Sequence, residues 1–392
     1  MTDWNTWKRH ALYHEANKVT HIFLEPQLRA FLPVLEAANY DYGLFGLNLF
    51  RSWVSQGYLN LGMDEQGGKI QLMGEAVPPR LMPHPVKLLI NGNMVADYAY
   101  GLASPLDATL DPTQQRRFGF SGVIEHTHRT LKEPLHLHAV IEPTNLPMPP
   151  LQDYWLLPCD APLPDDDNMK RVTGGDASAI RFIMYGASFY QKLRQVVELY
   201  STRPYEAFRD VLDWGCGCGR MLRYFSNEPE KNVVGVDIDP VNISWCKANL
   251  PQFAFATIDA HQPLPFSDGS FDLIYGNSVF THLRPTDQDF WLGEINRVLK
   301  ADGIALVTVH AQHNWVRSGW CEMAQLLQLV KDGIRVAEGH NPDIEDVIGG
   351  YYVDAAHDQA YITDHWRQFV DVLDIIESYS GTLAAVVLRK KS

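Results

Sequence analysis

Residues 211–220 read V-L-D-W-G-C-G-C-G-R, and this stretch decides the fold. Val211 and Leu212 are typical of the end of a buried strand, and Met221 with the apolar residues after it predicts a helix. Three glycines stand at alternate positions between the two: Gly215, Gly217 and Gly219. Glycine lets the backbone turn sharply and lets a ligand reach the backbone N–H groups without meeting a Cβ atom. The stretch therefore predicts a ligand-binding loop between a strand and a helix.

A second predicted strand follows at residues 233–236, and it ends in Asp237. An acidic residue about 20 positions after a glycine-rich loop binds ribose hydroxyls in nucleotide-binding α/β units. The dinucleotide fingerprint G-x-G-x-x-G does not fit, because its third glycine would fall on Arg220. No G-K-S or G-K-T follows, which excludes a phosphate-binding P-loop. The pattern therefore indicates a nucleotide-like ligand that is neither a dinucleotide nor a P-loop substrate.

Five motifs in this order resemble those of the class I S-adenosylmethionine-dependent methyltransferases, over residues 182–389. The glycine loop resembles the first motif, and G-V-D-I-D-P around Asp237 resembles the second. Three more follow: the adenine-contacting segment at 253–266, the strand-four motif at 271–283, and the helix and strand that close the parallel half at 294–310. The resemblance implies an α/β fold with a doubly wound, Rossmann-like sheet of seven strands whose last strand is reversed. It also implies S-adenosyl-L-methionine as the cofactor.

The end of the chain supports this fold independently of the glycine loop. Residues 370–376 and 383–389 have the pattern of strands, and the turn between them is so short that the two strands must be antiparallel. This hairpin resembles the reversed last strand of the methyltransferase fold.

The resemblance implies cofactor-binding roles for residues at the ends of the first two strands. The three loop glycines would let the backbone approach the methionine and ribose part, with Asp213 near the cofactor's amino group. Asp237 would accept both ribose hydroxyls, a role that needs two acceptor oxygens, and its alternative role is a helix N-cap. Ile238 would pack on the adenine face.

Further residues would meet the adenine and the sulfonium. Asp259 would accept from the adenine amino group, with Ala260 beside it, and a simple turn aspartate is the other interpretation. Asn277 and Ser278, after the fourth strand, would lie near the sulfonium end. A structural role for Asn277 is equally open.

A hydroxyl acceptor needs a general base with a pKa near neutral pH, and histidine is the usual choice. His310 ends the fifth strand and His282 follows the fourth, at the edge where doubly wound sheets bind ligands. Either is a candidate base; a packed, hydrogen-bonded role is the alternative for both and is favoured for His282. An amine acceptor would need no strong base. Near the fourth strand only Asn277 offers a metal ligand, so no catalytic metal is predicted.

The whole chain has 392 residues, enough for two or three domains, and a formal net charge of −14. This acidity, without any basic stripe, argues against nucleic acid as a partner. The first ten residues hold no apolar signal segment, and the most apolar early stretch, residues 43–54, contains Arg51. We therefore expect a cytoplasmic protein with no membrane span and with reduced cysteines, and its oligomeric state is open.

Four segments are predicted along the chain. Residues 1–60 have apolar positions at helical spacing, and residues 61–142 alternate as half-buried strands do, with a two-residue hairpin turn at Asn91-Gly92. These strands predict a small antiparallel β-sandwich, which resembles the immunoglobulin-like modules of bacterial glycan-modifying enzymes. Residues 143–179, rich in proline and aspartate, predict a linker. The methyltransferase domain would occupy residues 180–392 and begin with a helix up to Tyr200.

Two pairs of alternating histidines in the β region offer a separate hypothesis. In a hairpin centred near Lys132, four imidazoles would share one sheet face and form a transition-metal site: His126, His128, His136 and His138. A polar, solvent-facing surface is the other interpretation and the favoured one, because Pro134 stands beside the second strand.

The predicted reaction is methyl transfer by in-line displacement to a small-molecule or glycan acceptor, with a hydroxyl as the favoured acceptor group. The alternative is a non-catalytic protein that binds the cofactor or a carbohydrate, with the β domain as its binding module. Acceptor specificity is expected from residues 311–365, whose aromatic side chains suit stacking on a ring. The candidates there are Trp315, Trp320, Tyr351, Tyr352 and His357.

Overall fold

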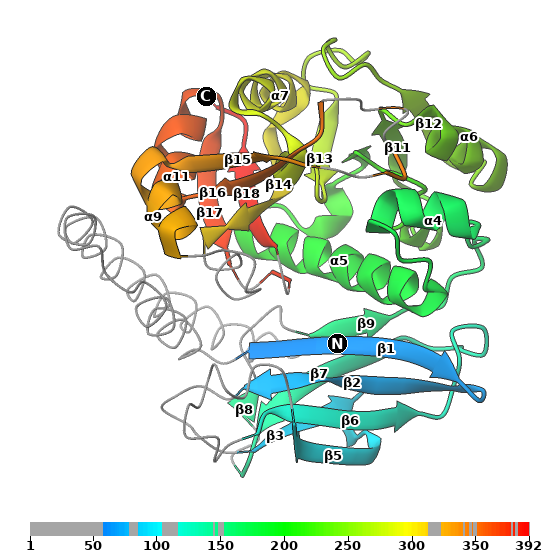
Figure 1. Cartoon of the computed structure of the whole chain (residues 1–392). Coiled ribbons are helices and arrows are strands. Elements are labelled where there is room, and N and C mark those ends of the chain that lie inside the picture. The colour runs from blue at the N-terminus through cyan, green and yellow to red at the C-terminus, as the bar shows by residue number, and fades with distance from the viewer. Residues whose placement is uncertain are drawn as a thin grey trace, which may run out of the picture.

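The computed structural model describes residues 58–77, 85–103, 117–143, 146–147, 153–312, 323–339, 342–344, 347, 351–377, 379–380 and 383–391. The helical segment predicted at residues 1–60 lies outside the described residues, except that residues 58–60 already belong to the first strand. Two antiparallel sheets and one mixed sheet organise the described chain (Figure 1). Among its described helices, none combines the length and the apolar character needed to cross a membrane.

The N-terminal part contains two antiparallel sheets that share one apolar core. The first has the order β1 (Tyr58–Gln66), β2 (Lys69–Val77), β6 (Gly119–Ile124), β5 (Ala96–Leu102). The second has the order β4 (Asn93–Met94), β3 (Val86–Ile90), β7 (Leu135–Ile141), β8 (Leu146–Pro147), and β9 (Tyr154–Leu156) also pairs with β7. Leu61 and Leu72 of the first sheet lie in the same buried cluster as Leu88 and Leu137 of the second. Each sheet therefore buries one face, as alternating apolar residues dictate.

The turn predicted at Asn91-Gly92 joins β3 to β4. Both residues have positive φ angles, 48° and 84°, and Ile90 pairs with Asn93 across the turn. Two left-handed residues in a two-residue loop define a type I′ turn, whose twist matches that of hairpin strands. The predicted hairpin is confirmed.

The segment 143–179, predicted to be a linker, contains regular structure. Strand β9 lies in it, with Tyr154 and Leu156 buried in the N-terminal core, and so does helix α4 (Asp166–Thr173). The Asp165 carboxylate caps α4 by accepting a hydrogen bond of 2.9 Å from the Asn168 N–H. The aspartate run therefore begins a helix, because carboxylates favour the positive end of the helix dipole, and a solvated connection is the wrong interpretation.

The C-terminal part is built on the mixed sheet. Five strands run parallel in the order β12 (Ala254–Thr257), β11 (Asn232–Asp237), β10 (Asp210–Trp214), β13 (Phe271–Gly276), β14 (Leu299–Ala311). Strand β18 (Ala384–Arg389) is antiparallel to β14, and β17 (Asp371–Ile376) is antiparallel to β18. The antiparallel hairpin predicted at the end of the chain is confirmed by this pairing.

Two further strands extend this sheet to nine, where seven were predicted. Strand β16 (Val353–His357) runs parallel to the last residues of β14, where His310 pairs with Ala356, and β15 (Ile334–Glu338) is antiparallel to β16. Both strands come from residues 311–365, the segment from which acceptor specificity was expected. They form because β14 is 13 residues long and continues beyond its partner β13, so its last backbone groups need another strand.

Helices cover both faces of the mixed sheet. One face packs against α5 (Ala179–Tyr200), the 3-10 helix η3 (Leu222–Asn227) and α6 (Pro240–Asn249). The other packs against α7 (Pro285–Val298) and α11 (Gln359–His365), and α9 (Met323–Asp332) precedes β15. These layers place two apolar cores around the sheet.

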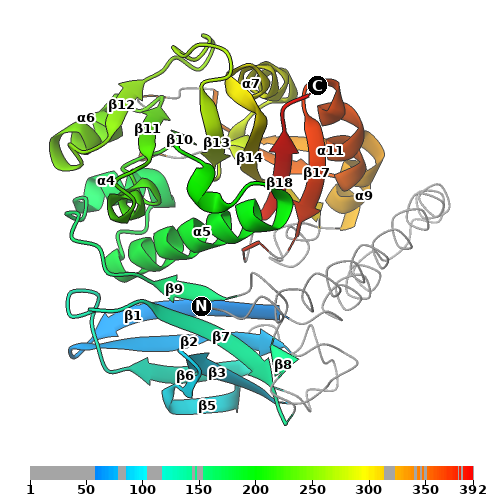
Figure 2. The same cartoon turned by 180° about the vertical axis from the view of Figure 1, so that it is seen from behind.

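Helix α5, where a helix was predicted, also joins the N-terminal sheets to the mixed sheet (Figure 2). Its Ile183 and Met184 lie in the N-terminal core, and its Leu193 and Val197 lie in the core under the mixed sheet. A single helix thus contributes to two cores, the beginning of the helix to the N-terminal core and the rest of it to the core under the mixed sheet.

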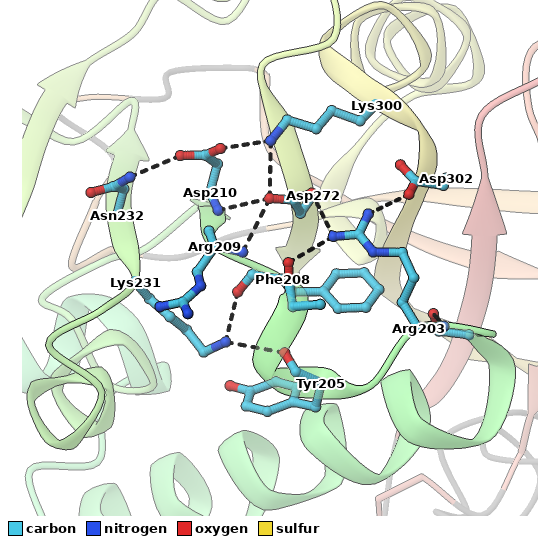
Figure 3. Close-up of polar contacts among 12 residues, drawn as sticks. Arg203, Tyr205, Phe208, Arg209, Asp210, Lys231, Asn232, Asp272, Lys300 and Asp302 are labelled. Atoms are coloured by element: carbon cyan, nitrogen blue, oxygen red, sulfur yellow. Dashed lines mark hydrogen bonds and ion pairs between the residues drawn. The ribbon is translucent and has the colours of Figure 1, made fainter.

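A charged network holds the edge of the mixed sheet where the strands begin (Figure 3). The buried Asp272 carboxylate, on β13, contacts Arg203 and Lys300 at 3.0 Å each, and Lys300 also lies 2.6 Å from Asp210. The backbone N–H groups of Arg209 and Asp210 donate to the same carboxylate. Burial alone would raise the pKa of Asp272, but these hydrogen bonds lower it to about 2.

Candidate functional site

A cavity of about 480 Å³ opens at the carboxyl ends of β10, β11 and β13. Helices α4 and α5 supply one wall, and the residues that lead into β16 supply another. Strand β10 lies between β11 and β13. The strands that follow β10 directly along the chain, β11 and β12, lie on one side of it, and the later strands β13 and β14 lie on the other, so the strand order reverses at β10. Doubly wound sheets bind their ligands at this kind of switch point.

The glycine loop forms the floor of this cavity. Gly215, Gly217 and Gly219 have φ angles of 78°, 51° and 74°, which favour glycine strongly. A Cβ atom at Gly217 would lie 2.8 Å from Val172 Cγ2 of α4, and one at Gly215 would collide with Val279. The loop thus needs glycine for conformation and for close packing. Gly215 and Gly217 line the cavity, whereas Gly219 packs against the protein.

Asp237 ends β11 and connects directly to the loop. One carboxylate oxygen accepts a hydrogen bond of 2.7 Å from the Gly217 N–H, and the other accepts one of 2.9 Å from the Asp239 N–H. Burial raises the pKa of Asp237 to about 6. The N-cap of α6 is Asp239, whose side chain accepts from the Val241 N–H, so the alternative N-cap role of Asp237 is wrong.

Asp213 and Arg220 lie on the wall behind the loop. Asp213 is buried, and burial raises its pKa to about 8, with the negative charge of Asp237 adding to the effect. Burial lowers the pKa of Arg220, and the nearby carboxyl of Asp213 opposes that shift. No described residue accepts a hydrogen bond from the Arg220 guanidinium, which lies over the ring of Phe189 at 6.0 Å. A ligand with an anionic group would therefore complete this wall.

The end of β13 presents an unpartnered acceptor. The buried Asn277 Oδ1 has no hydrogen-bond partner among the described residues. Ser278 has a φ angle of 63°, and its N–H donates to Thr308 Oγ1 at 2.7 Å. Both residues line the cavity, and strained backbone beside an orphaned polar atom is typical of ligand-binding sites.

His282, in the 3-10 turn after β13, also lines the cavity. Its Nδ1 lies 3.1 Å from the Val353 carbonyl oxygen, and its Nε2 lies 3.0 Å from the Tyr352 hydroxyl. A carbonyl oxygen can only accept, so Nδ1 carries the proton and Nε2 is an acceptor. Burial lowers the pKa of His282 to about 4. A neutral imidazole therefore lines the cavity.

The sequence of the site has known counterparts. Residues 211–303 match the family described as "Methyltransferase domain". This part of the chain is a class I S-adenosylmethionine-dependent methyltransferase domain. The family recognised from its five motifs is thereby confirmed, and its cofactor is S-adenosyl-L-methionine. The loop glycines, Asp237 and the orphaned Asn277 oxygen fit such a group, which carries hydroxyls and an ammonium.

Individual relatives of the methyltransferase domain cover only part of this chain. An uncharacterized methyltransferase from Synechocystis is 35% identical over 107 residues, which are 27% of this chain and 50% of that protein. Trans-aconitate 2-methyltransferase from Methylobacterium radiotolerans is 35% identical over 94 residues, which are 24% of this chain and 35% of that protein. The chain therefore spans half or less of the length of these relatives.

Solved structures also resemble the chain. The 1,6-didemethyltoxoflavin-N1-methyltransferase of Burkholderia thailandensis, solved with 1,6-didemethyltoxoflavin and S-adenosylhomocysteine, has 17% identity and a TM-score of 0.37. The match covers 61% of this chain and 96% of that one.

Most residues that the sequence assigns to the cofactor line the methyltransferase cavity. They are Asp213, Gly215, Gly217, Asp237, Ile238, Ala260, Asn277 and Ser278. Asp259 does not line it, and its carboxylate instead accepts from the His261 N–H at 2.8 Å, which is the turn role left open by the sequence. Of the two candidate bases, His282 lines the cavity and His310, paired with β16, does not.

The residues that were predicted to determine acceptor specificity fall into three groups. Tyr351 and Tyr352 line the cavity. His357 is fully buried, with its Nε2 3.1 Å from Gln288 Oε1, and lies in the protein core. The remaining candidates, Trp315 and Trp320, lie outside the described residues.

Helix α4 contributes cavity residues that sequence patterns did not reveal. Val172 packs on Gly217, and Arg171 Nε lies 2.6 Å from the Asp239 carboxylate at the start of α6. The capping pattern at Asp165 could have located this helix, but the surrounding prolines concealed it. Arg220 was also missed, although it directly follows the last loop glycine.

The four histidines of the β region do not share a sheet face. Strand β6 pairs with β2 and β5, whereas β7 belongs to the other sheet, so the predicted hairpin between them is wrong. His128 Nδ1 lies 2.8 Å from Glu65, and His136 Nε2 lies 2.6 Å from Asp153. Within the part of the chain that the structure describes, no three His, Cys, Asp or Glu side chains are grouped to hold a metal ion.

Proposed function

We propose that this protein transfers the methyl group of S-adenosyl-L-methionine to a hydroxyl group of a small, largely apolar acceptor. One observation carries the proposal: a single cavity joins the cofactor loop and Asp237 to His282. Several of the side chains that line this cavity are apolar: Val279, Leu283, Trp291, Ile344, Val347 and Leu383. Such a lining favours an apolar acceptor body over a glycan.

The cofactor's nucleoside would bind between the loop and the end of β11. Asp237 would accept the ribose hydroxyls, because its two carboxylate oxygens, which accept from the Gly217 and Asp239 N–H groups, have further lone pairs. Ile238 and Ala260, which line the same end, would pack on the adenine.

The methionine part would bind between β10, β13 and α5. Asn277 Oδ1 would accept from the ammonium, with Asp213 near it, and the Arg220 guanidinium would pair with the carboxylate. An ammonium beside Asp213 would favour the ionised carboxyl and lower its pKa from about 8. Ser278 lies at the same strand end and would face the sulfonium.

The cofactor supplies an electrophilic methyl group, so the protein's task is to align the acceptor oxygen and exclude water. His282 would accept the acceptor proton, since its neutral imidazole lines the cavity. His310 would not contact the acceptor, because it lies outside the cavity lining. The roles of the N-terminal sheets, the cytoplasmic location and the lack of a nucleic-acid partner stay predictions.

Calorimetry with S-adenosylhomocysteine and transfer of tritium from labelled S-adenosylmethionine to phenols, alcohols and oligosaccharides test the proposal. We expect cofactor binding and labelled phenol or alcohol ethers. Binding without transfer to any acceptor would favour the non-catalytic alternative. No binding, or transfer to oligosaccharides alone, would contradict the proposal.

A further inference from the structure

We propose that Tyr352 receives the proton of the acceptor hydroxyl while its own hydroxyl proton passes to His282. The inference rests on the proposed function, because it adds a proton path to the proposed methyl transfer. From the sequence, Tyr352 was only a candidate for acceptor specificity.

The Tyr352 hydroxyl and the His282 imidazole are in direct contact on the cavity wall. The hydroxyl lies 3.0 Å from His282 Nε2, and the two rings stack with centroids 4.1 Å apart at an angle of 19°. The Tyr352 ring also lies against Gly339, where a Cβ atom would come within 2.6 Å of Tyr352 Cδ1. The phenol is thus fixed by an imidazole and by close backbone, in a cavity that both Tyr352 and His282 line.

Three consecutive residues contact this one imidazole. Tyr352 donates its hydroxyl proton to Nε2, and the Val353 carbonyl accepts from Nδ1 at 3.1 Å. The Asp354 carboxylate lies 3.7 Å from Nδ1. This arrangement fixes the tautomer that can take a proton from Tyr352, and it places a negative charge where the imidazolium would form.

The charge state of His282 suits this role at neutral pH. Burial lowers its pKa to about 4, the hydrogen bond to Val353 opposes that shift, and the charge of His310 adds to it. Burial also raises the pKa of Asp354. The titratable groups that face His282 are therefore Tyr352 and Asp354 beside it and His310 on β14. Nε2 is unprotonated across the neutral range and is ready to accept.

The proton path closes without another reactant. The acceptor oxygen gains the methyl carbon, and the electron pair of the broken carbon–sulfur bond stays on sulfur. The acceptor proton moves to the Tyr352 oxygen as the Tyr352 proton moves to His282 Nε2. The imidazolium then releases that proton to water, with Asp354 beside it until release.

The first test observes the imidazole itself. Tyr352→Phe keeps the ring and removes the hydroxyl, and Tyr351→Phe is the matched control, because the buried Tyr351 hydroxyl has no hydrogen-bond partner among the described residues. We expect histidine ¹⁵N NMR of the full chain to show a protonated Nδ1 at His282. Tyr352→Phe should shift the Nε2 resonance, and Tyr351→Phe should not. An Nε2 resonance unmoved by Tyr352→Phe would overturn the inference.

The second test uses hydroxyl acceptors of different acidity, from benzyl alcohol to 4-nitrophenol, with labelled S-adenosylmethionine. On benzyl alcohol we expect Tyr352→Phe to lower kcat about 100-fold with KM within about twofold. On 4-nitrophenol at pH 8, which needs little help in losing its proton, the loss should be under about threefold. His282→Gln should show the same pattern. Equal losses on both acceptors would indicate a structural role and overturn the inference.

Calorimetry with S-adenosylhomocysteine separates this inference from the proposed function. If wild-type protein binds it and methylates alcohols, and Tyr352→Phe is equally fast, the inference is wrong and the proposed function stands. If wild-type protein methylates no hydroxyl in the series, hydroxyl transfer is wrong and the proton path with it.

Discussion

The backbone N–H of Gly217 donates a hydrogen bond of 2.7 Å to the carboxylate of Asp237, and so joins the glycine loop to the neighbouring strand. The same side chain holds the start of α6 through the Asp239 N–H. The loop conformation and the proposed ribose contact therefore depend on one carboxylate.

Replacing Asp237 should remove most of the cofactor affinity. We expect Asp237→Ala to weaken S-adenosylhomocysteine binding at least about 100-fold, because a charged acceptor for two hydroxyls is lost. Asp259→Ala is the control, since Asp259 only accepts from its own turn, and it should change the affinity less than about threefold. Calorimetry on both variants measures the difference, and similar losses would contradict the assignment.

Gly217 should tolerate no side chain. Gly217→Ala combines a φ angle of 51° with a contact of 2.8 Å to Val172, so we expect it to abolish cofactor binding and lower the melting temperature. Gly269→Ala has a similar φ angle of 63° but open space around it. Gly269→Ala should lower the free energy of unfolding by about 1 kcal/mol, because alanine is strained at this φ angle, and the variant should still bind the cofactor. Thermal melts and calorimetry on both variants measure the difference. Cofactor binding by Gly217→Ala would contradict the close packing of the glycine loop.

Arg220 should recognise the carboxylate of the cofactor and no other part of it. We expect Arg220→Leu to weaken S-adenosylhomocysteine binding about 10-fold or more. Methylthioadenosine, which lacks the amino acid, should bind wild-type and variant protein alike. The ratio of the two affinities is the measurement, and a parallel loss for both ligands would mean that Arg220 acts on the fold.

Asp272 should stabilise the sheet in a pH-dependent way. Its pKa is lowered in the folded protein, to about 2, so its contribution is full above the unfolded value of 3.8 and is lost as the pH falls through about 2. We expect Asp272→Asn to lower the free energy of unfolding by about 2 kcal/mol at pH 7. The deficit should shrink between pH 4 and pH 2.

The exposed partner of Arg203 provides the control for that network. Asp302 is 64% exposed, and Asp302→Asn should cost under about 1 kcal/mol at any pH. Urea unfolding at pH 7 and pH 3 distinguishes the two variants. A pH-independent deficit for Asp272→Asn would contradict the ionic account.

The sequence predicted best where chemistry and backbone geometry demand the same residue types. Gly215, Gly217 and Asp237 follow from the loop conformation and the ligand together, and the terminal hairpin follows from a turn too short for a parallel connection. The turn at Asn91-Gly92 was found for the same reason, since few residues adopt left-handed φ angles.

Other features depend on contacts between distant segments, which local patterns do not encode. Tyr352 reaches His282 only because β16 pairs with the end of β14, and α4 reaches the loop only through packing on Gly217. His128 and His136 were misjudged because the chain changes sheets between β6 and β7, which alternation along each strand does not reveal.

A crystal structure of the chain with S-adenosylhomocysteine tests the central claim most directly. The account predicts the ribose hydroxyls within hydrogen-bond distance of the Asp237 carboxylate and the sulfur on the side of the cavity that His282 lines. A ligand bound elsewhere, or a ribose that makes no contact with Asp237, would contradict it.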